Sequence, residues 1–401
     1  MFLEATLKRN PRLLQAALTF HQAGLIPPNT YVLDYDAVQA NARLLSQAAS
    51  AANMTLFFIT KQIGHNPPML EAIQRGGLRK GTAVDVIEAY ALASNGVTLG
   101  NVGHLTQIPR HDVKPVLMLN PEFFTVFSYN NAQQVYTWAL PFKRDTQIML
   151  RVSHPGDFFY PGQVGGVDLD QVVEVARAIN DLPPLRVAGV TSYPCLEYDE
   201  ATGELKPLPN LETVLKARDL LERALGYPLR CVDTPGATSV SAIKLLSRYG
   251  VTHAEPGHAL TGTTPLHASG DQPETSAMVY VSEVSHIQGD TAYIFGGGFY
   301  RRSRVKAALV GWQPEDLNEP PVPCSHPAPD TIDYYGQLDN IPSRVRVGDT
   351  VIMAFRSQIF VTHSFVAAVR HINDQPQLMG LWDARGHPAV YGVAAERYGA
   401  D

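Results

Sequence analysis

Short apolar runs alternate with longer amphipathic stretches from Tyr31 to about His258, and this alternation constrains the fold more than any other feature. The predicted strands cover residues 55–60, 81–86, 97–101, 123–128, 147–152, 187–193, 229–234 and 251–257. Apolar residues at three- and four-residue spacing predict helices between the strands, for example over 36–52, 167–181 and 210–225. Eight strands with crossover helices predict an α/β fold, a TIM-like (β/α)8 barrel.

One segment of this region leaves an alternative open. Residues 115–120 (PVLMLN) have the composition of a ninth strand, which would favour an open doubly wound sheet. Pro115 is equally compatible with the first turn of a helix at this place. We favour the closed barrel.

The pattern changes after about Thr264. Alternating apolar and polar residues with Gly-Asp turns predict a C-terminal β domain, either a sandwich or a small barrel, from residues 278–298, 344–355 and 358–372. Residues 308–335 are rich in proline and acidic side chains and are predicted to form a loop across this domain. The predicted organisation is an N-terminal helix over 1–30 that packs with the C-terminal domain, a barrel over 31–263 and a β domain over 264–401.

Charge and cysteine content exclude several classes of protein. The net charge of −6 provides no basic stripe, so we expect a small-molecule substrate and neither nucleic acid nor membrane as a partner. The N-terminal segment carries charges throughout and does not resemble a signal peptide. Cys195, Cys231 and Cys324 are scattered and form neither a disulfide framework nor a C-x-x-C metal site, which predicts a cytoplasmic protein.

The end of the first barrel strand carries a lysine. Lys61 follows the largely apolar run 55–60, and chemistry in such barrels takes place where the strands end. A lysine at the mouth of a buried strand is partly desolvated, which favours its neutral, nucleophilic amine. The alternative is an ordinary strand-end lysine that reaches solvent.

Small residues follow the last two barrel strands. Thr238 and Ser239 precede a helix after the seventh strand, and Gly257 and His258 follow the eighth. Backbone N–H groups and hydroxyls at such turns can bind a phosphate, and barrels often bind phosphate at these two strands. Each turn alone is also compatible with an ordinary helix start.

These features, in this order, resemble the fold-type III pyridoxal-phosphate family of alanine racemase, D-threonine aldolase and D-serine dehydratase. The resemblance rests on Asp34, Asn41, Lys61, the tripeptide 191–193 and the turns 234–239 and 255–262. The sequence resembles the YhfX-like branch more closely, through residues 1–11, 253–263, 270–274 and 296–302. The resemblance implies a barrel that carries pyridoxal 5'-phosphate, a C-terminal β domain, and a head-to-tail homodimer whose active sites take residues from both subunits.

The resemblance also implies roles for individual residues. Lys61 would bind the cofactor covalently, while Thr238, Ser239, Gly257 and His258 would hold its phosphate. Glu255 occupies the position of an arginine in alanine racemases, as in the decarboxylases of the family. A carboxylate there would keep the ring nitrogen protonated and make the ring a full electron sink.

Several positions depart from the family pattern. Ser192 replaces a histidine that stacks on the cofactor ring, which leaves Tyr193 or His104 to cover that face. The second catalytic base has three candidates, namely Tyr293, Tyr300 and Cys195. A metal-ligand pair of the aldolases is replaced by Gln358-Ile359-Phe360, so we expect no metal there, and Arg301 and Arg302 are candidates to grip a substrate carboxylate.

The predicted function is a pyridoxal-phosphate-dependent enzyme acting at Cα of an amino acid, with an amino-acid racemase or epimerase favoured. Decarboxylation, elimination or retro-aldol cleavage would follow from the same chemistry if no second base existed. A non-catalytic protein that binds pyridoxal phosphate is a further alternative. The last alternative is a barrel enzyme that uses Lys61 without a cofactor.

Overall fold

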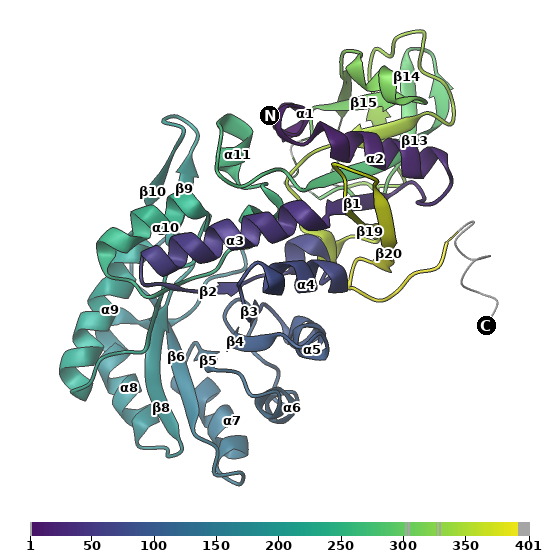
Figure 1. The fold of residues 1–401 in the computed structure, drawn as a ribbon. Coiled ribbons are helices and arrows are strands. Elements are labelled where there is room, and N and C mark those ends of the chain that lie inside the picture. The colour runs from purple at the N-terminus through teal and green to yellow at the C-terminus, as the bar shows by residue number, and fades with distance from the viewer. Residues whose placement is uncertain (1, 301–302, 304, 326, 329, 392–401) are drawn as a thin grey trace. The chain divides into compact units, whose positions relative to one another are not determined.

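The protein is described here by a computed structural model, which covers residues 2–300, 303, 305–325, 327, 328 and 330–391. Contacts between residues divide the chain into two compact units, drawn in Figure 1. The barrel unit comprises Arg43–Thr60 and Gly77–Ala259. The β unit comprises Met1–Ala42, Lys61–Gly76 and Leu260–Asp401.

The barrel unit contains eight parallel strands in a closed ring of pairings. They are β2 (Thr55–Phe58), β3 (Lys80–Ala83), β4 (Thr98–Val102), β5 (Phe123–Val126), β6 (Thr146–Ser153), β8 (Leu185–Thr191), β11 (Cys231–Asp233) and β12 (His253–Ala254). Each strand pairs in parallel with its neighbour, and β12 closes the ring on β2. The predicted (β/α)8 barrel and all eight of its strands are therefore confirmed.

Helices connect these strands (Figure 1). They are α5 (Val86–Ser94), α6 (Val113–Met118), α7 (Tyr129–Ala139), η2 (Leu169–Gln171), α8 (Val172–Asn180), α9 (Pro209–Leu225), α10 (Val240–Leu246) and η3 (Ser247–Tyr249). Helix α6 settles the alternative at 115–120, because Pro115 lies in its first turn, where a missing N–H costs no hydrogen bond. A short strand β7 (Val167–Asp168) pairs with β6, and β9 (Leu196–Asp199) pairs with β10 (Glu204–Pro207) in a hairpin.

The barrel interior is filled by side chains from several of its strands. Phe57, Phe123, Met149, Ala188 and Cys231 form one buried apolar cluster. Burial of a large apolar side chain is worth roughly 1.5–3 kcal/mol, so this cluster helps to hold the ring of strands closed.

The β unit is built on one long antiparallel strand. Its strands are β1 (Thr30–Asp34), β13 (Met278–Gln288), β14 (Thr291–Phe295), β15 (Ala307–Gly311), β16 (Val322–Ser325), β17 (Tyr335–Leu338), β18 (Thr350–Met353), β19 (Phe365–Arg370) and β20 (Gln377–Asp383). Strands β13, β14, β17, β16, β15 and β18 pair in a closed ring, while β1, β19 and β20 extend from β13. The predicted β domain is thus a small barrel with an extension.

The segment predicted as a loop over 308–335 is partly regular. It contains most of β15, η5 (Pro314–Asn318) and β16, whose Val322 and Cys324 are buried in alternation. The two buried side chains pack this strand against the sheet despite its prolines, so the prediction of a loop is wrong for this part.

The N-terminal region forms two helices rather than the expected single one, α1 (Phe2–Arg9) and α2 (Pro11–Gln22). Leu14 and Leu18 of α2 join the core cluster of the β unit with Val279 and Ile352. None of the described helices is both long and apolar enough to cross a membrane.

The division between the units differs from the predicted boundaries at 31 and 264. Strand β1 pairs with β13 on one side and β19 on the other, so residues 30–34 lie in the β unit. Residues 61–76, which include η1 (Lys61–Ile63) and α4 (Pro67–Arg75), also lie in the β unit. The division falls within α3 (Tyr35–Ala51). A local pattern cannot reveal these assignments, because the pairing partners come from distant parts of the chain.

Candidate active site

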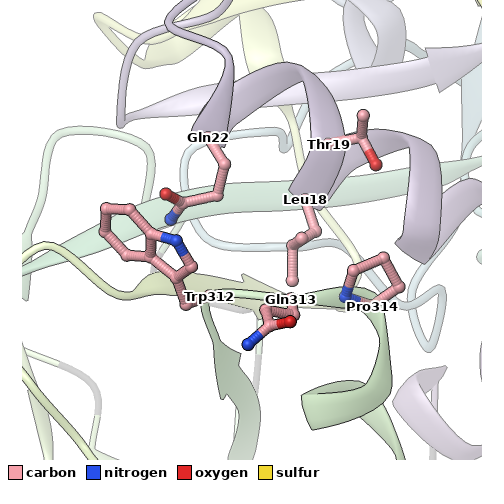
Figure 2. Close-up of a pocket in the computed structure, with 6 residues that line it drawn as sticks. All are labelled: Leu18, Thr19, Gln22, Trp312, Gln313 and Pro314. Carbon is pink, nitrogen blue, oxygen red and sulfur yellow. The ribbon is translucent and has the colours of Figure 1, made fainter.

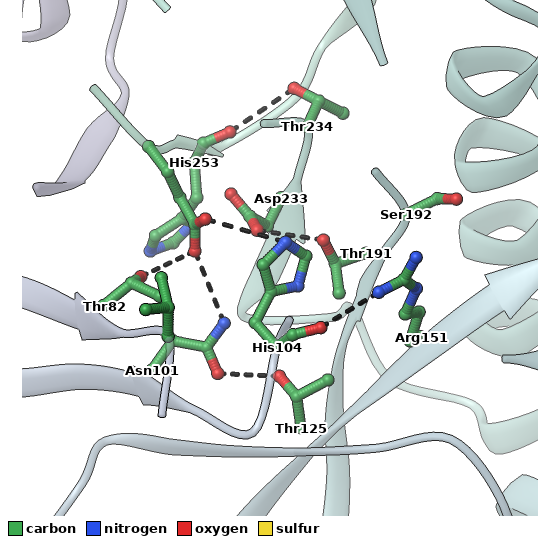
Figure 3. Close-up of polar contacts among 12 residues, drawn as sticks. Thr82, Asn101, His104, Thr125, Arg151, Thr191, Ser192, Asp233, Thr234 and His253 are labelled. Carbon is green, nitrogen blue, oxygen red and sulfur yellow. Dashed lines mark hydrogen bonds and ion pairs between the residues drawn. The ribbon is translucent and has the colours of Figure 1, made fainter. Parts of the chain in front are cut away.

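A buried carboxylate lies at the end of the last barrel strand. Glu255 directly follows β12, and its Oε1 accepts hydrogen bonds from Thr82 Oγ1 at 2.6 Å and Asn101 Nδ2 at 3.4 Å. Thr125 Oγ1 donates to Asn101 Oδ1 at 2.6 Å and thereby fixes the orientation of the amide (Figure 3). Donors from β3 and β4 thus favour the ionised form of Glu255 and hold it in one orientation.

His104 approaches this carboxylate from the loop after β4. Its Nε2 lies 3.7 Å from Glu255 Oε2, and both side chains are fully buried. The ring of Tyr193 meets the His104 ring edge-on, with 6.0 Å between ring centroids. The two residues expected to cover one face of a cofactor ring are therefore neighbours of each other.

A second carboxyl group lies beside the pair. Asp233 ends β11 and accepts a hydrogen bond from Thr191 Oγ1 at 2.9 Å. Burial raises the pKa of Asp233 to about 7, against the hydrogen bonds from Thr191 and the Thr234 N–H. One polar atom each of His104, Asp233 and Glu255 lies within 4.8 Å of the others.

Arg151 of β6 is a fully buried cation. Its guanidinium donates to the backbone carbonyls of His104 at 3.1 Å and Gln163 at 2.7 Å, and lies over the Phe127 ring at 4.7 Å. Burial lowers the pKa of Arg151 to about 10, so it stays charged at neutral pH. Among the described residues, no hydrogen bond is made by its Nε, which leaves a donor for an anionic ligand.

The turn after β11 has the features of an anion site. Gly236 has a φ of +149°, and a Cβ there would meet the backbone N and O of Leu196 at 2.8 Å, so the turn requires glycine. Thr238 is buried, and its hydroxyl has no hydrogen-bond partner within the described part of the chain. Ser239 Oγ accepts from Ala242 N–H at 3.2 Å and caps α10.

The predicted partner turn follows Glu255. Gly257 and His258 are both buried, and His258 begins η4 (His258–Thr261). The barrel unit thus contains both turns that were predicted to bind phosphate.

Lys61 begins η1 directly after Thr60, at the point where the chain passes from the barrel unit to the β unit. Its side chain is half-buried. Thr60 is fixed by Glu88, a fully buried residue of α5 whose Oε1 accepts from the Thr60 N–H at 3.0 Å and from the Thr60 hydroxyl. Glu88 Oε2 accepts from the Val84 N–H at 2.7 Å, so one side chain ties the ends of β2 and β3 together.

Cys195, one candidate for the second base, is fully buried in the barrel unit. Its thiol donates to Ser192 O at 3.3 Å, and burial raises the pKa of Cys195 well above its usual value. A thiol in this state stays protonated at neutral pH and is therefore poorly suited to accept a proton. Ser192, at the position of the stacking histidine, accepts from Asn210 Nδ2 at 3.3 Å.

The other two candidates lie in the β unit. Tyr293 alternates along β14 with buried Ala292 and Ile294 and stacks on His286, with ring centroids 4.6 Å apart. Tyr300 is half-buried in the segment after β14. Arg301 and Arg302 lie outside the described residues.

The stretch that replaces the aldolase metal ligands forms η6 (Ile359–Val361), with Gln358 at its N-terminus. Ile359 is buried, and Phe360 meets the His65 ring edge-on, with centroids 6.2 Å apart. These apolar contacts pack the loop that follows Lys61 within the β unit. The expectation of no metal there stays a prediction.

A pocket of about 470 Å³ lies elsewhere in the β unit (Figure 2). It is lined by Leu18, Thr19, Gln22, Trp312, Gln313 and Pro314. None of these six side chains titrates near neutral pH.

Sequence reasoning missed Glu88, Asp233, Thr82 and Asn101. Asp233 carried a usable signal, because an acidic residue at the end of an apolar strand indicates a functional position. Glu88 gave no such signal, because Asp85 and Glu88 have the spacing of an ordinary helix N-cap. Asp85 does accept a hydrogen bond from the Glu88 N–H at 2.8 Å.

Comparison with known proteins agrees with this arrangement. Residues 33–265 match the profile described as alanine racemase, N-terminal domain, and residues 279–378 match YhfX-like, C-terminal domain. The chain is 39% identical to the uncharacterized protein YhfX of Escherichia coli over 388 residues, which are 96% of this chain and 99% of that one.

Solved structures share the fold. D-threonine aldolase from Filomicrobium marinum aligns with a TM-score of 0.66 at 16% identity, covering 89% of this chain and 95% of that chain. Alanine racemase from Corynebacterium glutamicum aligns with a TM-score of 0.58 at 17% identity, covering 82% and 90%. The barrel, its site and these matches show that the chain belongs to the fold-type III pyridoxal-phosphate-dependent family, with an alanine racemase N-terminal domain and a YhfX-like C-terminal domain.

Proposed function

We propose that the protein is a pyridoxal-phosphate-dependent amino-acid racemase or epimerase, in which Lys61 binds the cofactor. Members of the family use this cofactor, which when bound supplies an electron sink for the charge that develops at Cα. The observation that carries the cofactor-dependent chemistry at Cα is the buried Glu255 carboxylate, held by Thr82 and Asn101; the choice of a racemase rests on the candidate second bases. A fixed, buried anion favours a protonated ring nitrogen.

The residues present fit the phosphate of this cofactor. The buried Thr238 hydroxyl has no partner among the described residues, and a phosphate oxygen would supply one. Gly236 and Gly257 let backbone N–H groups approach an anion closely, and Ser239 and His258 flank them. Arg151 supplies a further donor for an anionic group of cofactor or substrate.

Proton transfer at Cα is assigned to side chains of the chain itself. In the proposal the Lys61 amine takes the Cα proton as general base, and Tyr293 or Tyr300 returns one to the opposite face. In the proposal His104 and Tyr193, whose rings meet edge-on, cover one face of the cofactor ring.

A lyase is the second candidate function. One observation favours it: Cys195, the candidate base within the barrel unit, is a buried thiol with a raised pKa. Without a base on the second face, the same charge at Cα would lead to elimination, decarboxylation or carbon–carbon cleavage.

The proposed assembly is a cytoplasmic head-to-tail homodimer. Ile332, Tyr334 and Val361 of the β unit are 60–70% exposed, and a second copy that buries them would remove apolar surface from water. The three free cysteines are buried, as expected in a reducing compartment. Sedimentation velocity at several concentrations would test the dimer, and a monomer throughout would contradict it.

The deciding experiment incubates the cofactor-loaded protein with a panel of L- and D-amino acids in deuterated water. Exchange of the Cα proton, followed by NMR, with conversion between enantiomers supports a racemase. Exchange or consumption accompanied by a new carbonyl product supports a lyase. Cofactor binding without either outcome would contradict both functions.

A further inference from the structure

Asp233 is a second buried carboxyl group in the barrel unit, and the chemistry proposed above does not use it. Its Oδ2 accepts the Thr191 hydroxyl at 2.9 Å, whereas its Oδ1 has no hydrogen-bond partner among the residues that the structure describes. A buried carboxylate oxygen without a donor is costly. A protonated Oδ1 would instead be a donor that needs an acceptor nearby.

Possible hydrogen-bond acceptors for a proton on Asp233 Oδ1 lie nearby. Figure 3 shows the His104 ring beside the Asp233 carboxyl group, and polar atoms of these two side chains and of Glu255 lie within 4.8 Å of one another. His104 Nε2 itself lies 3.7 Å from Glu255 Oε2. Two carboxyl groups and an imidazole therefore share one buried space.

The two carboxyl groups have unlike surroundings. Glu255 Oε1 accepts from two donors, the Thr82 hydroxyl and the Asn101 amide, which favours the charged form. Asp233 accepts from the Thr191 hydroxyl and from the Thr234 N–H, but burial outweighs both hydrogen bonds and raises its pKa. Two adjacent negative charges in a buried site repel strongly, so one of the two groups is expected to hold a proton. The raised pKa of Asp233, and an Oδ1 without a partner in the described part of the chain, identify it as that group.

We propose that Asp233 is a positioning residue that holds a proton on Oδ1 and offers it to the His104–Glu255 pair, so that the three side chains together carry one negative charge. The inference rests on the proposed function in one respect: the charge left on Glu255 is the one that would face a protonated ring nitrogen. One anion then matches one cation, and the three side chains carry no second negative charge.

The other ionisable groups named next, which lie near Asp233, do not neutralise a second negative charge beside Glu255. Burial raises the pKa of Asp233 to about 7 and those of Cys195 and Cys231 well above the usual range, so both thiols stay neutral. Burial lowers the pKa of His253, paired in register with Asp233, to about 4, so it is neutral too. Arg151 is charged, but two of its nitrogens are bound to backbone carbonyls.

Infrared difference spectroscopy on the full-length protein without added cofactor tests this directly. The wild type should show the carbonyl band of a buried, protonated carboxyl group at mildly acidic pH, lost as the pH rises through about 7. Asp233→Asn should lack the band and keep the fold, because the amide carbonyl still accepts the Thr191 hydroxyl. Asp219→Asn, an exposed change on α9, should keep the band.

A second variant keeps the test decisive if Asp233→Asn fails to fold. Thr191→Val removes the donor that stabilises the charged form, so the band should persist to higher pH. A band that keeps its wild-type midpoint in this variant overturns the assignment to Asp233.

The cofactor-loaded protein gives an independent readout. Its visible absorbance should change with pH in the wild type and in Asp219→Asn, with the transition lost in Asp233→Asn. A wild type that binds no pyridoxal phosphate contradicts the proposed function, while the infrared result still decides the state of Asp233. Stoichiometric Zn²⁺ or Mn²⁺ in the purified protein, lost in Asp233→Asn, would overturn the proposal, because a metal would then balance the charge.

Discussion

Glu88 accepts hydrogen bonds from both the backbone N–H and the hydroxyl group of Thr60, the residue that directly precedes Lys61. The same carboxylate accepts from the Val84 N–H on the neighbouring strand end. A buried side chain with three donors acts as a clamp on the backbone that leads into Lys61, the proposed cofactor lysine.

Replacing Glu88 by Gln should weaken this clamp. The NH2 group of Gln is a donor and would face a buried backbone N–H, which is also a donor. We expect an apparent stability loss of roughly 1–3 kcal/mol, the usual cost of an unsatisfied buried group. We also expect a lower yield of cofactor bound at Lys61. Chemical denaturation and absorbance titration measure the two effects. Glu71→Gln, an exposed change on α4, serves as control, and equal behaviour of the two variants would contradict the role of Glu88.

Lys61 is predicted to be the residue that binds the cofactor. Borohydride reduction of the loaded protein, followed by peptide mapping, should place the pyridoxyl group on Lys61, and Lys61→Ala should lose the visible absorbance. Lys80 and Lys244 provide internal controls in the barrel unit. A label on either of them instead would refute the assignment.

Thr238→Val tests the phosphate site. The substitution removes a hydroxyl that has no partner within the described residues, so the cofactor-free protein should keep its stability. Cofactor affinity should fall about tenfold or more, since a hydrogen bond to a charged group is worth roughly 1.5–3 kcal/mol. Gly257→Asp should weaken binding further, because it brings a negative charge to the phosphate. Wild-type affinity in both variants would place the phosphate elsewhere.

Glu255→Gln separates binding from chemistry. Gln retains an acceptor for Thr82 and Asn101 but removes the charge that favours a protonated ring nitrogen. Cα exchange should therefore slow far more than cofactor binding weakens. Loss of thermal stability with unchanged exchange would mark Glu255 as a structural turn residue.

His253 makes the stability of the barrel unit sensitive to acid. Burial lowers its pKa from 6.5 to about 4, so the unfolded chain binds the proton first as the pH falls. The contribution of His253 to the free energy of unfolding is therefore fully present above pH 6.5 and is lost as the pH falls toward 4. The loss amounts to about 3 kcal/mol, at about 1.4 kcal/mol per pKa unit. His253→Gln should flatten the acid limb of a stability–pH profile, whereas the exposed His111→Gln should leave it unchanged.

The sequence by itself determined the barrel and several positions of the candidate site. Strand and helix patterns are local, so hydrophobic periodicity located all eight barrel strands and the β-rich C-terminal part. Strand-end positions likewise identified Glu255 and the turns at Thr238 and Gly257, because side chains that end parallel strands meet at one edge of a barrel.

Tertiary structure decided what depends on distant partners. Pairing with β13 and β19 moved β1 into the β unit, and no pattern within residues 30–34 reveals such partners. The clamp of Glu88 on Thr60 and the approach of Asp233 to the His104–Glu255 pair also join separate segments. Burial and charge balance belong to the assembled site, so the protonation of these groups is a property of the fold and not of any single segment.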